Sequence, residues 1–184
     1  DSIGIFHERF IKIRKQIDPA LHVDHVMFSS LHDHEAPDTM VIWSYSPLRP
    51  RFDHQYMALV QKACKEAVEE AVRNLQPAET ILAQVTAGPE GYLDDSRQPI
   101  VYDNVIRCAR FVKKGTDDTI ATVVEWGNHP ETLGGANSLL TSDFSGYWRD
   151  AVENGVPDPH GAKGLGGMCL YFQGCVGGLM TQLH

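Results

Sequence analysis

The chain has 184 residues, of which 42% are hydrophobic and 22% charged, and its formal net charge is −8. This is the composition of an ordinary globular protein that is long enough to bury a sizeable core. The surplus of acid argues against binding to nucleic acid backbones, which requires basic patches. No apolar run approaches the roughly 20 residues that a membrane-spanning helix needs.

The first half of the chain carries two helical patterns. Apolar residues recur every three or four positions over 3–17 and again over 53–75, which predicts two amphipathic helices. Between them we expect a short strand at 25–30 and a long loop at 32–51. A loop of that length inside a compact domain is usually functional or disordered.

The second half is mainly extended. Strands are expected at 80–86 and 168–172, and a β-hairpin at 105–112 and 119–126. Ser142 or Asp143 can cap a helix that runs to Val152. Helices and strands alternate and several strands are apolar on both faces. The pattern predicts an α/β fold over residues 1–184, a single layered domain with a buried, central mixed β-sheet flanked by helices.

Two histidines stand out after the first predicted strand. His32 and His34 are spaced i, i+2, and in an extended backbone such residues project to the same side. His129 repeats the arrangement, because it follows the strand predicted at 121–126. Imidazole is the commonest protein ligand for zinc-like metals. We therefore expect the two segments to be two halves of one metal centre.

Each of these signals has an ordinary alternative. A lone His-x-His pair is about as often a solvated surface turn, and a histidine after a strand more often makes a hydrogen bond. The neighbouring carboxylates can ligate a metal, orient the histidines from outside, or simply be solvated, and solvation is the default interpretation for each. These carboxylates are Asp33, Glu35, Asp38 and Glu131.

Five short motifs carry a family resemblance, in order along nearly the whole chain. They are Asp1-Ser2-Ile3-Gly4, Ser30-Leu31-His32-Asp33-His34-Glu35-Ala36-Pro37, Asn128-His129-Pro130-Glu131, Ser142-Asp143-Phe144-Ser145-Gly146 and Phe172-Gln173-Gly174-Cys175-Val176-Gly177-Gly178. The set resembles the catalytic domain of the neutral/alkaline (non-lysosomal) ceramidases and their bacterial relatives. The second motif, for example, is similar to that family's Thr-His-Thr-His-Ser-Gly-Pro.

The resemblance implies zinc-dependent hydrolysis of an amide in a small-molecule or lipid substrate. By carry-over, His32 and His129 would bind Zn²⁺, and His34 would contact the substrate carbonyl or the transition state. Arg97 is the best local match to an arginine that serves the family's site. The family's remaining ligands, a glutamate and a tyrosine, would come from further along a longer protein, of which we expect this chain to be a segment. An extracytoplasmic or secreted location is also implied.

One departure from the family bears on mechanism. Aligning the end of the chain with the family's Gly-Asp-x-Ser-Pro-Asn places Met180 where the family has its key serine. A thioether can neither attack a carbonyl nor relay a proton, so we expect hydrolysis by metal-activated water. The acids Asp33 and Glu35 also replace neutral residues of the family motif, which makes the site more negative and should disfavour anionic substrates.

Met180 also supports a rival hypothesis, a catalytically inactive relative that keeps the fold. Such a protein would bind a lipid or carbohydrate ligand, or a partner protein, through the loop at 32–51 with Trp43, Tyr45 and Phe52. Packing within the loop is the ordinary role of those aromatic residues. A purely structural zinc module is disfavoured, because a closed set of four ligands is absent from the sequence.

Overall fold

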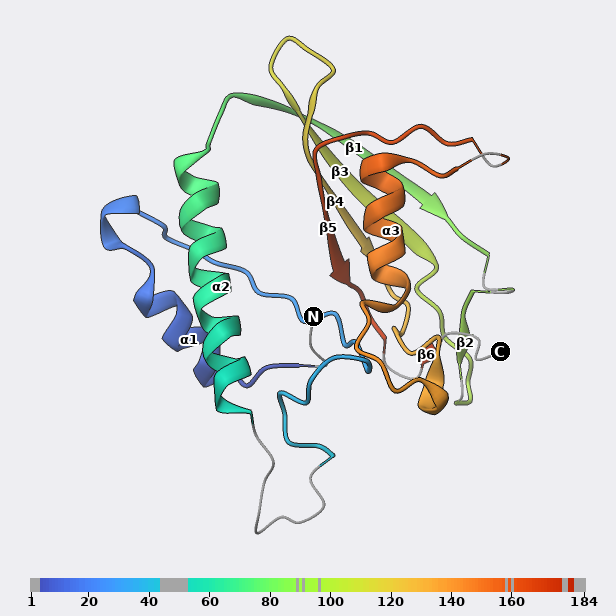
Figure 1. The fold of residues 1–184 in the computed structure, drawn as a ribbon. Helices are drawn as coiled ribbons and strands as arrows, with labels where there is room; N and C mark the ends of the chain where they lie inside the picture. The colour runs from blue at the N-terminus through green and yellow to red at the C-terminus, as the bar shows by residue number, and fades with distance from the viewer. Residues whose placement is uncertain are drawn as a thin grey trace.

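The computed structural model describes residues 4–43, 53–88, 90, 92–95, 97–157, 159 and 161–176, and the backbone of 179–180. Within these residues the α-helices are α1 (His7–Gln16), α2 (His54–Arg73) and α3 (Asp143–Asn154), with short 3-10 helices at Pro19–Leu21 and Gly134–Ala136. The strands are β1 (Ala78–Thr86), β2 (Asp94–Asp95), β3 (Val105–Lys113), β4 (Thr119–Trp126), β5 (Met168–Gln173) and β6 (Leu179–Met180). The predicted α/β fold is confirmed (Figure 1).

The central sheet is mixed, as the sequence predicts. Its strand order is β1-β3-β4-β5, and a separate two-stranded sheet pairs β2 with β6. β1 pairs with β3 and β3 with β4 in antiparallel fashion, whereas β4 and β5 are parallel. A parallel pair requires a crossover connection, and here the crossover contains α3. The carboxyl ends of β4 and β5 consequently lie at the same edge of the sheet.

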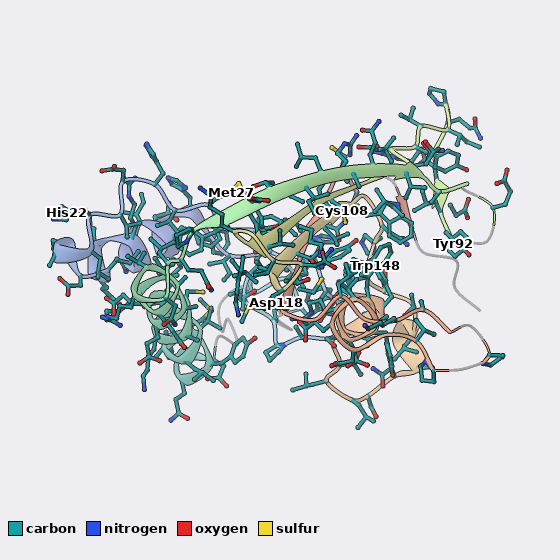
Figure 2. All side chains as sticks on the ribbon, turned by 90° about the horizontal axis from the view of Figure 1, so that it is seen from above. His22, Met27, Tyr92, Cys108, Asp118 and Trp148 are labelled. Atoms are coloured by element: carbon teal, nitrogen blue, oxygen red, sulfur yellow. The ribbon has the colours of Figure 1, made fainter. Side chains whose placement is uncertain are left out.

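An aromatic cluster joins α3 to the sheet. Trp126 at the end of β4 lies 5.2 Å from Trp148 and 5.9 Å from Phe144 between ring centroids, and both partners come from α3. Tyr171 of β5 completes the cluster against the same two rings. Figure 2 shows Trp148 between α3 and the strands. These ring contacts pack α3, and with it the crossover, against the sheet.

The predicted strand at 25–30 is wrong, because residues 22–33 of the structure contain no strand. Side-chain contacts hold this segment instead, although Met27 remains 76% exposed. Phe28 stacks on Phe10 of α1 with a centroid distance of 4.6 Å, and Leu31 joins the core cluster around Trp126. The segment is therefore held by side-chain packing and has no ladder of backbone hydrogen bonds.

The expectation of a buried sheet is also wrong at one edge. Every residue of β1 is exposed, and apolar side chains such as Leu82, at 77% exposure, face solvent. Burial is concentrated at β4, where Val124 is only 1% exposed. Among the described residues, none of the helices combines the length and the apolar character that crossing a bilayer demands.

The end of β4 offers a test of this packing. The buried Tyr171 hydroxyl donates to the Trp126 carbonyl at 3.0 Å. Tyr171→Phe removes this donor while keeping the ring, and we expect a loss of about 0.5–1.5 kcal/mol in the free energy of unfolding, measured by urea titration. Tyr147→Phe, whose ring is 81% exposed, is the matched control and should change stability by less than about 0.5 kcal/mol. Equal effects from both variants would contradict this role of Tyr171.

Candidate metal centre

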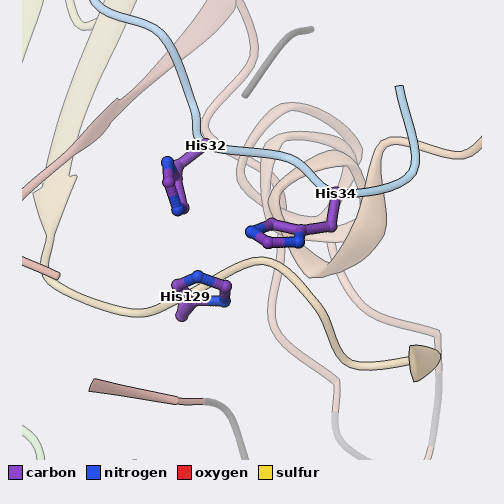
Figure 3. Close-up of side chains that lie close together, drawn as sticks. All are labelled: His32, His34 and His129. Carbon is purple, nitrogen blue, oxygen red and sulfur yellow. The ribbon is translucent and has the colours of Figure 1, made fainter. Parts of the chain in front are cut away.

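Three imidazoles converge at the end of the sheet where the carboxyl ends of β4 and β5 lie. His32, His34 and His129 each offer a nitrogen, and these atoms all lie within 4.8 Å of one another. The ring centroids are 5.0 Å apart for His32 and His34, 4.7 Å for His32 and His129, and 4.5 Å for His34 and His129. Figure 3 shows the three rings reaching from two separate segments toward one space. The structure thus brings together the three histidines that the sequence singled out.

Backbone contacts fix the two segments against each other. The His34 N–H donates to the Pro130 carbonyl at 3.2 Å, which ties the His-x-His segment to the loop after β4. His32 has a φ of 64°, in the left-handed region, so the two histidines do not converge through the extended backbone that the i, i+2 argument assumed. A turn at His32, and not strand geometry, aims the pair.

A close approach between two segments of the chain places His129. A Cβ on Gly127 would lie 2.7 Å from the Cys175 carbonyl oxygen, so only glycine fits where β4 passes the end of β5. On the far side of His129, the carboxylate of Asp143 accepts hydrogen bonds from the N–H and the hydroxyl of Thr132, both at 2.7 Å. His129 therefore lies in a loop that is anchored on both sides.

The nitrogen atoms of the trio suit a divalent metal. Among the described residues, His34 Nε2 and His129 Nδ1 are buried and have no hydrogen-bond partner. A buried polar atom without a partner costs free energy. A metal bond to His34 Nε2 would offset that cost, and a hydrogen bond from His129 Nδ1 to a nearby acceptor would do the same. Burial lowers the pKa of His129 to about 4, aided by His34 and His32 and opposed by Asp143. Burial likewise lowers the pKa of His34, against the opposing charge of Glu131. Both rings are thus neutral at pH 7, which is the form that binds metals.

Two of the four carboxylates that neighbour the histidines in the sequence are buried. Asp33 is 1% exposed and Glu35 is 9% exposed, so the default interpretation of solvation is wrong for both. Burial raises the pKa of Asp33, and the nearby charges of Asp143 and Glu35 add to this effect, although the N–H of Glu35 opposes it. The hydroxyl of Thr141 donates to Glu35. Asp38 accepts from the N–H groups of Met40 and Trp43 and so closes a local turn.

Two clefts adjoin the site. A polar cleft of about 330 Å³ is lined by His34, Glu131, Trp43 and the loop at 134–140. The Trp43 ring meets His34 edge-on at 5.7 Å. A larger apolar cleft of about 910 Å³ lies against α3 and reaches Asn128 and Thr132, the residues that flank the His129 loop. The polar cleft can admit a reacting group, and the apolar cleft can hold a hydrocarbon chain.

Other predicted residues lie elsewhere. Arg97 is exposed, and its N–H donates to Asp95. No hydrogen bond or ion pair among the described residues joins Arg97 to the histidines, and its role stays a prediction. The side chain of Met180, together with Tyr45 and Phe52, lies outside the described residues. Asp143 is the residue that sequence reasoning undervalued, because an acid at a helix start looks like an ordinary cap.

Comparison with known proteins supports the fold. The structure is similar to that of neutral ceramidase from Pseudomonas aeruginosa, with a TM-score of 0.78 and 17% identity over 99% of this chain and 30% of that chain. A structure of a ceramidase complexed with C2 gives a TM-score of 0.76 and 17% identity over 97% of this chain and 29% of that one. No family model matches the sequence, and a search of curated proteins gave no significant match. The chain therefore has a ceramidase-like fold and spans under a third of these solved relatives.

Asp143→Asn tests the anchor of the histidine loop. Asparagine tolerates the positive φ of 45° at this position, so the backbone should not interfere. The two carboxylate oxygens of Asp143 accept from the N–H groups of Thr132 and Phe144. In asparagine an NH₂ group replaces one of these oxygens, so a donor then faces one of the two N–H groups. We expect a loss of about 1–3 kcal/mol in the free energy of unfolding. Asp150→Asn, on the exposed side of α3, is the control. A loss no larger than that of the control would remove Asp143 from this role.

Proposed function

We propose that this protein is a zinc-dependent hydrolase that cleaves an amide or related bond. The observation that carries the proposal is the convergence of His32, His34 and His129, with ligand atoms within 4.8 Å of one another. A catalytic zinc site takes about three protein ligands and leaves one position open. The ceramidase-like fold supports the reaction class, and the site chemistry supports the metal.

The three histidines have separable roles in this proposal. His32 and His129 hold the metal, and His34 is close enough either to be the third ligand or to face the substrate carbonyl. Bound zinc polarises a carbonyl and lowers the pKa of a water molecule to roughly 7. Asp143 and Thr132 keep the His129 loop in place during the reaction, and Arg97 is proposed to stabilise developing negative charge.

The proposed substrate is amphipathic. The apolar cleft beside the His129 loop is lined by Trp126, Phe144, Tyr147 and Trp148, and it fits a hydrocarbon chain. The buried acids beside the histidines favour a neutral or cationic group near the scissile bond. By resemblance to the ceramidases, we also propose an extracytoplasmic location.

Metal binding is the first test. Purified protein should bind one equivalent of Zn²⁺ by calorimetry, and His32→Ala and His129→Ala should each weaken binding at least about 100-fold, because each removes a ligand. His34→Ala separates its two roles, since loss of a ligand weakens binding whereas loss of a substrate contact does not. His25→Ala, at an exposed position, is the control. Undiminished binding in both His32→Ala and His129→Ala would refute the metal site.

Hydrolysis is the second test and separates the enzyme from an inactive relative. We expect turnover of N-acyl amides that carry a long apolar chain and a neutral head group, loss of turnover with a chelator, and recovery with zinc. Anionic amides of equal chain length should react more slowly because of the buried acids. Binding of these amides without any turnover, in zinc-loaded protein, would favour the inactive relative.

A further inference from the structure

Glu131 contacts two of the three histidines at once. Its Oε1 lies 3.7 Å from Nδ1 of His34, and its Oε2 lies 3.6 Å from Nδ1 of His129. The two histidines are 95 positions apart in the chain, so one carboxylate spans both halves of the site. The Glu131 side chain is 28% exposed, on the wall of the polar cleft.

We propose that Glu131 is a positioning residue that fixes the tautomer and the orientation of His34 and His129 together. A carboxylate beside Nδ1 favours a proton on that atom, because the N–H can then donate to the carboxylate. The lone pair of each ring is consequently left on Nε2. A histidine that binds a metal commonly donates its other N–H to such a carboxylate.

The pattern of buried atoms agrees with this assignment. His34 Nε2 is buried and finds no hydrogen-bond partner in the part of the chain that the structure describes, as expected of an atom that is kept for a metal. His129 Nδ1 is also buried without a hydrogen bond, and Glu131 Oε2 is an acceptor within reach after a small rotation. Distances of 3.6 and 3.7 Å are longer than a hydrogen bond, and each would shorten on forming one.

The local backbone holds Glu131 where this role requires it. The Glu131 N–H donates to the His129 carbonyl at 3.0 Å, and the Glu131 carbonyl accepts from Gly134 at 3.3 Å. Pro130, between the two functional residues, is fully buried and accepts the His34 N–H. The Asn-His-Pro-Glu motif thus supplies a ligand, the contact to the opposite segment and the orienting acid within four residues.

The expected change in zinc affinity rests on the proposed metal site, whereas the expected change in the tautomers of the rings does not. In metal-free protein, the two-bond ¹⁵N–¹H spectrum should show His34 and His129 protonated at Nδ1. Glu131→Ala should shift both rings toward the Nε2-protonated form. Glu79→Gln, at an exposed position on β1, is the control and should leave the spectrum unchanged.

Zinc affinity provides the second readout. By competition with a chromophoric chelator, we expect Glu131→Ala to bind Zn²⁺ about 10- to 100-fold more weakly than the parent chain. Glu131→Gln keeps an acceptor oxygen and should lose less. Both variants should melt within a few degrees of the parent when metal-free, because the side chain is partly exposed. If Glu131→Ala proves unstable, Glu131→Leu replaces it, because leucine also removes the acceptor and keeps most of the side-chain volume.

Each result of these two experiments contradicts a different part of the proposal. Unchanged tautomers in both variants overturn the proposal, whatever the metal does. Altered tautomers with unchanged zinc affinity overturn its link to the metal. A parent chain that binds no zinc refutes the proposed function, while the spectrum of the metal-free protein still decides whether Glu131 orients the rings.

Discussion

The carbonyl of Trp126 is the point on which the site depends. It accepts hydrogen bonds from the Gly174 N–H at 2.9 Å, the Tyr171 hydroxyl at 3.0 Å and the Gln173 side chain at 3.3 Å. All three donors come from the end of β5. These hydrogen bonds join the ends of the parallel strands β4 and β5. The chain that follows Trp126 leads directly to His129. A histidine placed by a strand end is held more rigidly than one on a free loop.

Parallel pairing has a second consequence for the site. Because β4 and β5 run in the same direction, the chain must return along the sheet, and α3 makes that return. The start of α3 therefore lies at the same edge as His129. Asp143, the first residue of that helix, accepts from Thr132 and so closes the loop that carries the histidine. Topology, aromatic packing and the polar anchor are thus parts of one arrangement.

The sequence predicts the helices and most strands well, since their periodicity is long and clear. It also identifies His32, His34 and His129, because histidines beside proline after apolar runs are distinctive. It fails at 25–30, where Phe28 stacks on α1 and the segment forms no ladder. It fails at β1 too, where apolar residues stay exposed along a sheet edge. Tertiary context decides both cases, and local pattern carries no information about it.

The sequence identifies the acids Asp33 and Glu35 but does not predict their burial, which bears on the proposed chemistry. Within the part of the chain that the structure describes, Asp33 and Glu35 each have a buried carboxylate oxygen without a hydrogen-bond partner. Buried carboxylates without compensation are costly, and a nearby cation is the usual compensation. The same negative field that favours a divalent metal repels an anionic head group. In the proposed hydrolase, one set of residues would therefore act on both the metal and the substrate, and a ceramidase-like fold would carry a selectivity that its overall shape does not disclose.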